Sequence, residues 1–417
     1  MTEQRRLITL AVIGGIAFGA RLSVRLARGE ANFWEQSYGF YFDLAQKLVN
    51  EHTFCLDALS CAYWTPLYPA FLALATGGAR RFEAVAVAQS LVGAGTALCA
   101  YGLARRWFDA RAGLIAAALT ALYPYFVVHD TALQETGLYT LAVAAATLVL
   151  DAVSSARRPV WAAALAGGLT GLAMLVRPSL APFVPLALGW LWFAMRSTPA
   201  AVWWKTLGGY AAAVCVVLAP WLLRNTLVVG RPTLTTRIGH SLWIGNNPQT
   251  FSHYPQGSID RSTEAAWAAL TPTELAEVKQ AVARGETALD DWFRARALAF
   301  VRAHPGRTLA AAGRKLGAAF WWRLNPVKGW REQLVYGGGY VPVMLLALGG
   351  AWRLARRRRW SPLVLCGAHV VAFGLTTAVF WAHTSHRSYL DVYFIVLAGG
   401  ALSALCQGNQ RADHQST

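Results

Sequence analysis

The chain has 417 residues, of which 55% are hydrophobic and 14% are charged, and its formal net charge is +17. Soluble proteins usually carry about 25% charged residues, so this composition excludes a set of ordinary soluble domains. Long apolar runs recur from end to end, and inside a bilayer each run can satisfy its backbone hydrogen bonds only as a helix. The sequence therefore predicts an all-α, polytopic helical membrane protein.

Ten apolar segments are long enough to cross the membrane. They are 7–27, 83–104, 112–129, 134–152, 160–177, 179–196, 206–228, 338–355, 361–382 and 389–406. The first resembles a secretory signal, but no small-x-small cleavage site follows it and apolar runs continue to the end, so we interpret it as a retained helix. This predicts ten helices with both termini in the cytoplasm.

Arginine clusters support this orientation. With residues 1–6 inside, the arginines at 105–106, 157–158 and 356–359 all fall on the cytoplasmic side, as the positive-inside rule requires. Because these clusters lie in short gaps between apolar runs, the positive charge is explained without nucleic-acid binding, and no nucleic-acid partner is expected.

The apolar stretch at 66–78 is the one ambiguous segment. It has only 13 residues, with two prolines in its first turn, and that length favours an interfacial or re-entrant piece over a span. Counting it as a span would put four arginines, at 105–106 and 157–158, outside. We therefore place it on the outer face, at the cost of leaving Arg80 and Arg81 outside.

This topology divides the chain into four regions. They are an N-terminal transmembrane catalytic module (1–229) with a first outer loop at 28–82, a large periplasmic loop (230–337), C-terminal transmembrane helices (338–406) and a polar cytoplasmic tail (407–417).

Four helices are predicted in the outer loops in addition to the spans. Residues 38–50 carry an apolar stripe that predicts an amphipathic helix on the membrane surface. Residues 271–306 predict two soluble helices, the first opened by a capping box from Thr271 to Glu274. Residues 307–326 predict a basic amphipathic helix near the interface.

Cysteines and glycines are assigned by their surroundings. Cys55 and Cys61 lie in the first outer loop, where an oxidising compartment would favour a disulfide; two free thiols are the open alternative. The other four cysteines lie in apolar spans, where a buried thiol behaves as a small hydrophobic side chain. The glycines of "GGLTG" at 167–171 predict close helix packing.

Ionisable groups at membrane depth are costly and therefore mark functional sites. We expect an external cavity in which a carboxylate acts as general base and arginines hold a phosphate leaving group, while aromatic side chains line a sugar or lipid groove. The residues that point to it are Glu35, Asp43, Glu135, Arg177, His386 and Arg387.

Each of these residues has a structural alternative. Arg177 would snorkel to head groups, Glu135 would stabilise a helix start, and Asp43 would lie on a solvated helix face. His383 and His386 would be surface histidines. No run of His, Asp or Glu has dense metal-ligand spacing, and the sequence alone does not decide whether a divalent metal takes part. The sequence contains no Gly-x-Ser-x-Gly elbow, P-loop or dinucleotide fingerprint.

Several stretches, in order from about residue 33 to 402, resemble the GT-C glycosyltransferases of bacterial family 39, relatives of protein O-mannosyltransferases and of the lipid A aminoarabinose transferases. The stretches are "YFDLAQKLVNEHTF" with "AYWTPLYPAFLAL", "QETGLYTLAVAAATLVL", "GLTGLAMLVRP", "APWLLRN" with "IGHSLWIGNNPQT", and "SHRSYLDVYFIVLAGG".

The resemblance implies a catalytic acid early in the first outer loop. Family members usually place it about four residues before the aromatic that is Tyr41 here, but Ser37 holds that place. Glu35, two residues upstream, is therefore the predicted base, and Asp43 is the alternative. Glu135 carries over as a second acid of the cleft. The departure at Ser37 leaves open a member that has lost catalysis.

The resemblance also implies contacts with donor and acceptor. Arg177 and Arg387 carry over as contacts to the lipid phosphate, and Asn246 and Asn247 contact sugar hydroxyls or build a turn. The predicted substrate-binding residues are Arg177, Arg387, His386, Tyr68, Asn246 and Asn247.

The predicted function is that of an integral glycosyltransferase of the cytoplasmic membrane with its active site facing the periplasm. It would transfer a sugar from a polyprenyl-phosphate donor to a glycan, lipid or protein acceptor. A flippase or transporter of lipid-linked sugars is one alternative, although such proteins usually show inverted repeats and none is evident. A catalytically inactive, lipid-binding member is another.

Overall fold

The structure, a computed structural model, describes residues 2–35 and 38–415, with side chains described as far as residue 407. Within these ranges the chain forms α-helices and two short 3-10 helices, and no strand. The α-helices are α1 Glu3–Arg28, α2 Phe40–Asn50, α3 Leu67–Thr76, α4 Phe82–Trp107, α5 Ala110–Leu122, α6 Pro124–Asp130, α7 Thr136–Ala152, α8 Pro159–Val176, α9 Phe183–Met195, α10 Ala200–Val229, α11 Ile238–Gly245, α12 Ile259–Ala268, α13 Pro272–Arg284, α14 Glu286–Ala303, α15 Pro305–Phe320, α16 Trp330–Arg356, α17 Trp360–Val379 and α18 Thr384–Gln415.

The predicted spans are confirmed with one difference. Among the described residues, nine helices are long and apolar enough to cross a membrane, and the bent pair α5 and α6 makes a tenth if it is one span. We predicted a single helix at 112–129, but the chain bends by 52° between α5 and α6. Pro124 begins α6 and Tyr123 is extended, because a proline disfavours helical geometry in the residue before it.

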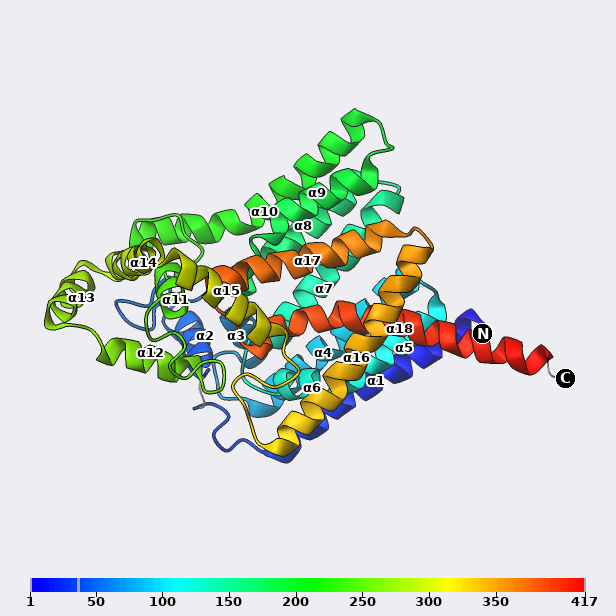
Figure 1. Ribbon diagram of the computed structural model, residues 1–417, viewed down its shortest axis with the longest axis horizontal. Helices are drawn as coiled ribbons and strands as arrows, with labels where there is room; N and C mark the ends of the chain where they lie inside the picture. Colours follow the sequence, from blue (N-terminus) through cyan, green and yellow to red (C-terminus); the bar gives the residue numbers. More distant parts are fainter. Residues whose placement is uncertain (1, 36–37, 416–417) are drawn as a thin grey trace.

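The two ends of the bundle differ in charge and shape. Figure 1 shows the N and C termini at one end and the helices α11 to α14 at the other. Two of the arginine clusters meet, because Arg359 donates to the carbonyls of Trp107 and Arg106 at 2.6 and 3.1 Å. Arg106 in turn binds Asp151 at 2.5 Å. Two of the three clusters that the sequence assigns to the cytoplasmic side therefore lie together.

Close packing of α8 on α10 depends on two glycines. A Cβ on Gly167 would lie 2.2 Å from the carbonyl oxygen of Tyr210, and one on Gly171 would lie 2.9 Å from Cβ of Val217. Real Cβ atoms do not approach neighbours so closely, and small residues at such positions let helix backbones come together. The packing role predicted for the glycines at 167–171 is confirmed for these two.

The first outer loop folds onto itself. Helix α2 packs on α3, and Tyr41 and Phe42 are buried in a cluster with Phe33, Trp34 and Tyr68. Protein side chains therefore cover part of the apolar stripe that we expected on the membrane surface, since Tyr41 and Leu44 are buried while Phe40, Leu48 and Val49 are partly exposed. Helix α3 has ten residues and is too short to span, as predicted.

The large outer loop has its own small core. Trp243, Tyr254 and Phe293 are buried together there. Helix α13 begins with the predicted capping box, in which Thr271 and Glu274 exchange hydrogen bonds. The basic helix predicted at 307–326 corresponds to α15 but ends at Phe320.

Glu286 of α14 joins the two outer loops. Its carboxylate accepts hydrogen bonds from the backbone N–H groups of Cys61 and Ala62 at 3.0 and 3.1 Å, and from the Thr236 hydroxyl. Cys61 forms a disulfide with Cys55, which decides between the two alternatives for this pair. The segment that follows the disulfide is therefore held against the start of the large loop.

Candidate functional site

Glu135 and Arg177 form a nearly buried ion pair where two helix ends meet. Glu135 precedes α7 and Arg177 follows α8. The Arg177 Nε donates to Glu135 Oε1 at 2.8 Å, and its Nη2 donates to the Thr136 hydroxyl at 2.9 Å. Arg177 thus does more than snorkel to head groups. Glu135 makes no side-chain hydrogen bond to the helix start, so a capping role does not account for its position.

The second oxygen of Glu135 is available to a ligand. Glu135 is only 7% exposed, and its Oε2 is buried without a hydrogen-bond partner among the described residues. Leaving a buried acceptor unsatisfied costs about 1–3 kcal/mol, so such atoms mark sites that a substrate or water completes.

Two tyrosines of the first outer loop lie beside this pair. Burial raises the pKa of Tyr38 and the negative charge of Glu135 raises it further, whereas Arg177 and Arg237 lower it. Burial also raises the pKa of Tyr41 well above its usual value, and the same three charges act on it. Tyr38 and Tyr41 therefore lie within electrostatic reach of both Glu135 and Arg177.

Arg237 contributes a cation from the large loop. Its guanidinium lies over the ring of Trp64 at 4.5 Å and that of Tyr63 at 5.2 Å. Across the described ranges it forms no ion pair, and its Nε is buried without an acceptor. Sequence reasoning missed this residue, although it directly precedes the motif "IGHSLWIGNNPQT" that was singled out.

Two histidines of the last outer turn complete the surroundings. The backbone N–H of His383 donates to Nδ1 of His386 at 3.4 Å. Burial lowers the pKa of His383 to about 4; Lys328 and Arg177 lower it further and Asp260 opposes them. His383 is therefore neutral near pH 7 and lies near Arg177, not at an isolated surface position. Within the described residues, no three His, Cys, Asp or Glu side chains are placed to hold a metal ion.

Arg387 is buried and paired with an aspartate of its own helix. It is fully buried, its Nε is 3.2 Å from Asp391 Oδ1, its Nη2 donates to the Tyr336 hydroxyl at 2.7 Å and it lies over the ring of Tyr340 at 3.9 Å. Consecutive residues of a helix project about 100° apart, which is why His386 and Arg387 serve different surroundings. The charge of Arg387 is already neutralised.

The predicted bases of the first loop are solvent-exposed. Asp43 is exposed on α2; partial burial raises its pKa and the charge of Arg80 opposes this. Glu35 is exposed too, with no hydrogen bond or ion pair to the described residues. Ser37, which holds the place expected for the acid, lies outside the described residues.

Asn246 and Asn247 build the turn after α11. The Asn246 amide donates to the carbonyls of Leu242 and Val379 at 2.8 Å each. The Asn247 amide donates to the Trp243 carbonyl at 2.7 Å, and its oxygen accepts from the Gln249 N–H. Of the two alternatives for this pair, these bonds favour the turn.

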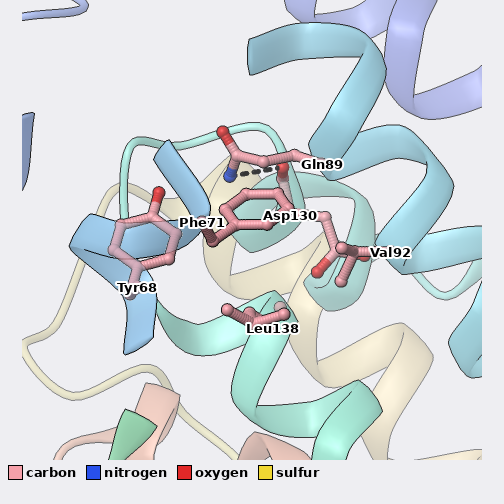
Figure 2. A pocket seen from close by; sticks show the side chains of 7 residues that line it. Tyr68, Phe71, Gln89, Val92, Asp130 and Leu138 are labelled. Atoms are coloured by element: carbon pink, nitrogen blue, oxygen red, sulfur yellow. Dashed lines mark hydrogen bonds between the residues drawn. The ribbon is translucent and has the colours of Figure 1, made fainter. Parts of the chain in front are cut away.

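Tyr68 lines a small pocket between α3, α4 and α7 (Figure 2). Gln89 donates to the backbone carbonyl of Asp130 there at 3.1 Å. The Asp130 carboxylate is bound by Arg21 at 2.6 Å, so this pocket carries no unpaired charge. Tyr68 also packs edge-on against Tyr41 at 5.0 Å. Burial raises the pKa of Tyr68 well above its usual value and the charge of Glu135 raises it further, so Tyr68 is within electrostatic reach of Glu135.

The comparisons agree with the fold. Residues 64–223 match the family model of dolichyl-phosphate-mannose-protein mannosyltransferases. This segment includes Glu135 and Arg177 and excludes Glu35 and Asp43. No curated protein sequence matches the chain.

Solved structures match over nearly the whole chain. The archaeal oligosaccharyltransferase AglB from Archaeoglobus fulgidus, in complex with an inhibitory peptide and a dolichol-phosphate, is 15% identical, with a TM-score of 0.58 over 99% of this chain and 52% of that chain. The apo oligosaccharyltransferase of the same organism is 14% identical, with a TM-score of 0.61 over 100% and 52%. ArnT from Cupriavidus metallidurans, bound to undecaprenyl phosphate, is 16% identical, with a TM-score of 0.45 over 99% and 80%.

The chain spans about half the length of the oligosaccharyltransferase that it matches. At sequence identities of about 15% the structural matches establish only the fold. The family model adds a sequence similarity to the mannosyltransferase family over residues 64–223. The chain is therefore a polytopic membrane protein with the fold of these GT-C glycosyltransferases, and its residues 64–223 are similar to the mannosyltransferase family.

Proposed function

We propose that the chain is a membrane glycosyltransferase that moves a sugar from a polyprenyl-phosphate donor to an acceptor on the outer face of the membrane. The observation that carries this proposal is the Glu135–Arg177 pair, with its unpartnered carboxylate oxygen, in a protein of the GT-C fold. A structure of the same fold, the archaeal oligosaccharyltransferase, holds a dolichol-phosphate, which is a lipid-linked phosphate of the class proposed here.

The orientation is supported from both ends of the bundle. The Cys55–Cys61 disulfide lies in the loop that carries Glu35, and disulfides persist in oxidising compartments such as the periplasm. The arginine clusters meet at the opposite end, as expected of cytoplasmic loops. The site therefore faces the exterior side of a cytoplasmic membrane.

Arg237 is the residue we assign to the donor phosphate. It carries no ion pair to the described residues, lies on aromatic rings and is close enough to Tyr38 and Tyr41 to affect their titration. A guanidinium binds a phosphate through two parallel hydrogen bonds. Arg177 adds positive charge nearby, whereas Arg387 is already neutralised by Asp391 and is not used for this role.

The reaction follows from these assignments. Glu35 orients the acceptor nucleophile and takes its proton, the nucleophile bonds to the anomeric carbon, and the bond from that carbon to the phosphate oxygen breaks. Polyprenyl phosphate leaves with its charge stabilised by Arg237. The free oxygen of Glu135 positions a hydroxyl of acceptor or donor. Asp43, which is exposed on α2 as Glu35 is exposed in the loop, is the alternative base.

Transfer activity tests the proposal. Purified protein in nanodiscs is incubated with labelled decaprenyl-phosphate mannose or decaprenyl-phosphate aminoarabinose and with membranes as acceptor. We expect Glu35→Gln to lower label transfer by about 10²- to 10⁴-fold, the usual contribution of a general base, and Glu135→Gln to lower it as well, because it removes the charge that positions the hydroxyl. Glu83→Gln is the matched control, because Glu83 is an exposed acid at the outer start of α4. If no donor gives transfer with the parent protein, or if both acid variants match the control, the enzyme proposal is wrong.

A further inference from the structure

A second hollow opens at the outer end of α1. It has a volume of about 450 Å³ and lies between the start of the first outer loop and the connection from α6 to α7. Its lining residues are Arg25, Arg28, Ala31, Phe33, Tyr38, Ala132, Leu133 and Gln134. We call it the α1 cavity.

Arg25 is held rigidly in the wall of the α1 cavity. It is only 8% exposed, and its guanidinium donates to the carbonyls of Thr131 and Gly29 at 2.8 and 2.6 Å. The rings of Phe33 and Phe82 lie 4.6 and 5.2 Å from it. Its Nε is buried and has no acceptor within the described ranges, so a fixed cation with a spare donor faces this region.

Arg28 places a second cation one helical turn away. It is exposed and donates to the Thr131 hydroxyl at 3.3 Å. Neither Arg25 nor Arg28 forms an ion pair with any residue that the structure describes. On the same helix, by contrast, Arg21 is neutralised by Asp130 at 2.6 Å. Like charges three residues apart on a helix repel, so an anion in the α1 cavity would relieve this repulsion and satisfy the free donor.

The α1 cavity adjoins the proposed catalytic residues. Phe33 and Tyr38 line it, and Glu35 lies between them in the chain. Gln134 also lines it and directly precedes Glu135. Tyr38 is within electrostatic reach of Glu135, Arg177 and Arg237. The cavity therefore meets the loop that bears the proposed base, which is where an acceptor nucleophile must arrive.

We propose that the α1 cavity is the acceptor site and that the acceptor carries a phosphate or carboxylate group close to the nucleophile that receives the sugar. Arg25 and Arg28 bind that oxyanion and thereby set the distance from the nucleophile to Glu35. The identification of the ligand as acceptor rests on the proposed function; the presence of an oxyanion site rests on the cavity alone.

Binding of inorganic pyrophosphate tests this site. Full-length protein in nanodiscs containing saturating undecaprenyl phosphate, which fills the donor site, is titrated calorimetrically with pyrophosphate at constant ionic strength. Since a charge-assisted hydrogen bond is about twice as strong as a neutral one, we expect Arg28→Gln to weaken binding about tenfold and Arg28→Lys to retain most of it. Arg5→Gln is the control, because Arg5 is an exposed arginine near the other end of the same helix. The amount of undecaprenyl phosphate that co-purifies with the protein in detergent, measured by mass spectrometry before the nanodiscs are formed, should fall in Arg237→Gln and stay unchanged in Arg28→Gln.

The outcomes separate the two proposals. Equal pyrophosphate binding by the parent, Arg28→Gln and Arg5→Gln would overturn the oxyanion site. Loss of undecaprenyl phosphate in Arg28→Gln would show that the cavity holds the carrier phosphate, which overturns the acceptor assignment. Binding that depends on Arg28 in a protein that retains no polyprenyl phosphate would overturn the proposed function and leave the oxyanion site standing.

Discussion

Replacing Arg177 by leucine should destabilise the protein more than removing both members of its ion pair. Arg177 makes two charge-assisted hydrogen bonds, to Glu135 at 2.8 Å and to Thr136 at 2.9 Å. In Arg177→Leu the Glu135 carboxylate stays buried with both oxygens unsatisfied. Breaking one side of a buried pair in this way costs about 3–5 kcal/mol.

The double variant Arg177→Leu with Glu135→Leu removes that unpaired charge. Replacing both partners of a buried pair by apolar side chains is often neutral. Only the Thr136 hydroxyl then lacks its partner, at a cost of about 1 kcal/mol. We therefore expect the double variant to be more stable than Arg177→Leu alone, by about 2 kcal/mol or more.

Equilibrium unfolding in one detergent, followed by tryptophan fluorescence, measures these differences. The control is Arg231→Leu, because Arg231 and Asp291 form an ion pair in which both side chains are more than a third exposed, and exposed pairs contribute about 1 kcal/mol or less. If the double variant is destabilised by the sum of the two single changes, the two charges are not coupled and the role given to the pair is wrong.

Three further outcomes are expected. Cys55 and Cys61, which are 6 positions apart and form a disulfide, should react with a maleimide only after reduction, and labelling without reduction would contradict the bond. Cys55→Ser should lower the free energy of unfolding by about 2 kcal/mol, because the unfolded chain then loses its loop closure. Burial lowers the pKa of His240 to about 4, so its stabilising contribution is full above about pH 6.5 and is lost as the pH falls towards 4. His240→Gln should flatten a melting-temperature profile over that window, and an unchanged slope would argue against it. Gly167→Ala should destabilise the protein by about 1–3 kcal/mol through overpacking. Gly168→Ala should leave the stability unchanged, because its Cβ would meet only Val217 at 4.0 Å. Equal melting temperatures of the two variants would refute the packing argument.

The spans were predictable because the bilayer imposes one solution on every apolar run. Length alone separated the ten-residue α3 from the spans. The bend at Pro124 carried a sequence signal, a proline inside an apolar run, but whether such a helix kinks or breaks depends on its neighbours. The burial of Tyr41 and Phe42 could not be predicted from the sequence, because an apolar stripe has the same residue pattern whether protein or lipid covers it.

The site was predictable in its residue types and not in its pairings. Glu135 and Arg177 are 42 positions apart, and only the meeting of two helix ends brings them together. Arg387 looked equivalent to Arg177 in sequence, yet one turn of its own helix supplies Asp391, which takes up its charge. Asn246 and Asn247 likewise turn their amides to backbone carbonyls.

The arginines of this chain divide by whether a carboxylate meets them. Arg21, Arg106 and Arg387 each bind an aspartate at 2.5 to 3.2 Å, and each joins two segments of the bundle or braces one helix. Arg25 and Arg237 are held just as firmly by aromatic rings, yet among the described residues no carboxylate meets them. Desolvating a cation without a counter-charge is costly, and among the described residues the guanidiniums of Arg25 and Arg237 have no such counter-charge. A substrate that brings its own negative charges, one on the donor and one on the acceptor, would supply what both lack. Tyr38 lines the α1 cavity together with Arg25 and is within electrostatic reach of Arg237, so one loop would contact both anions.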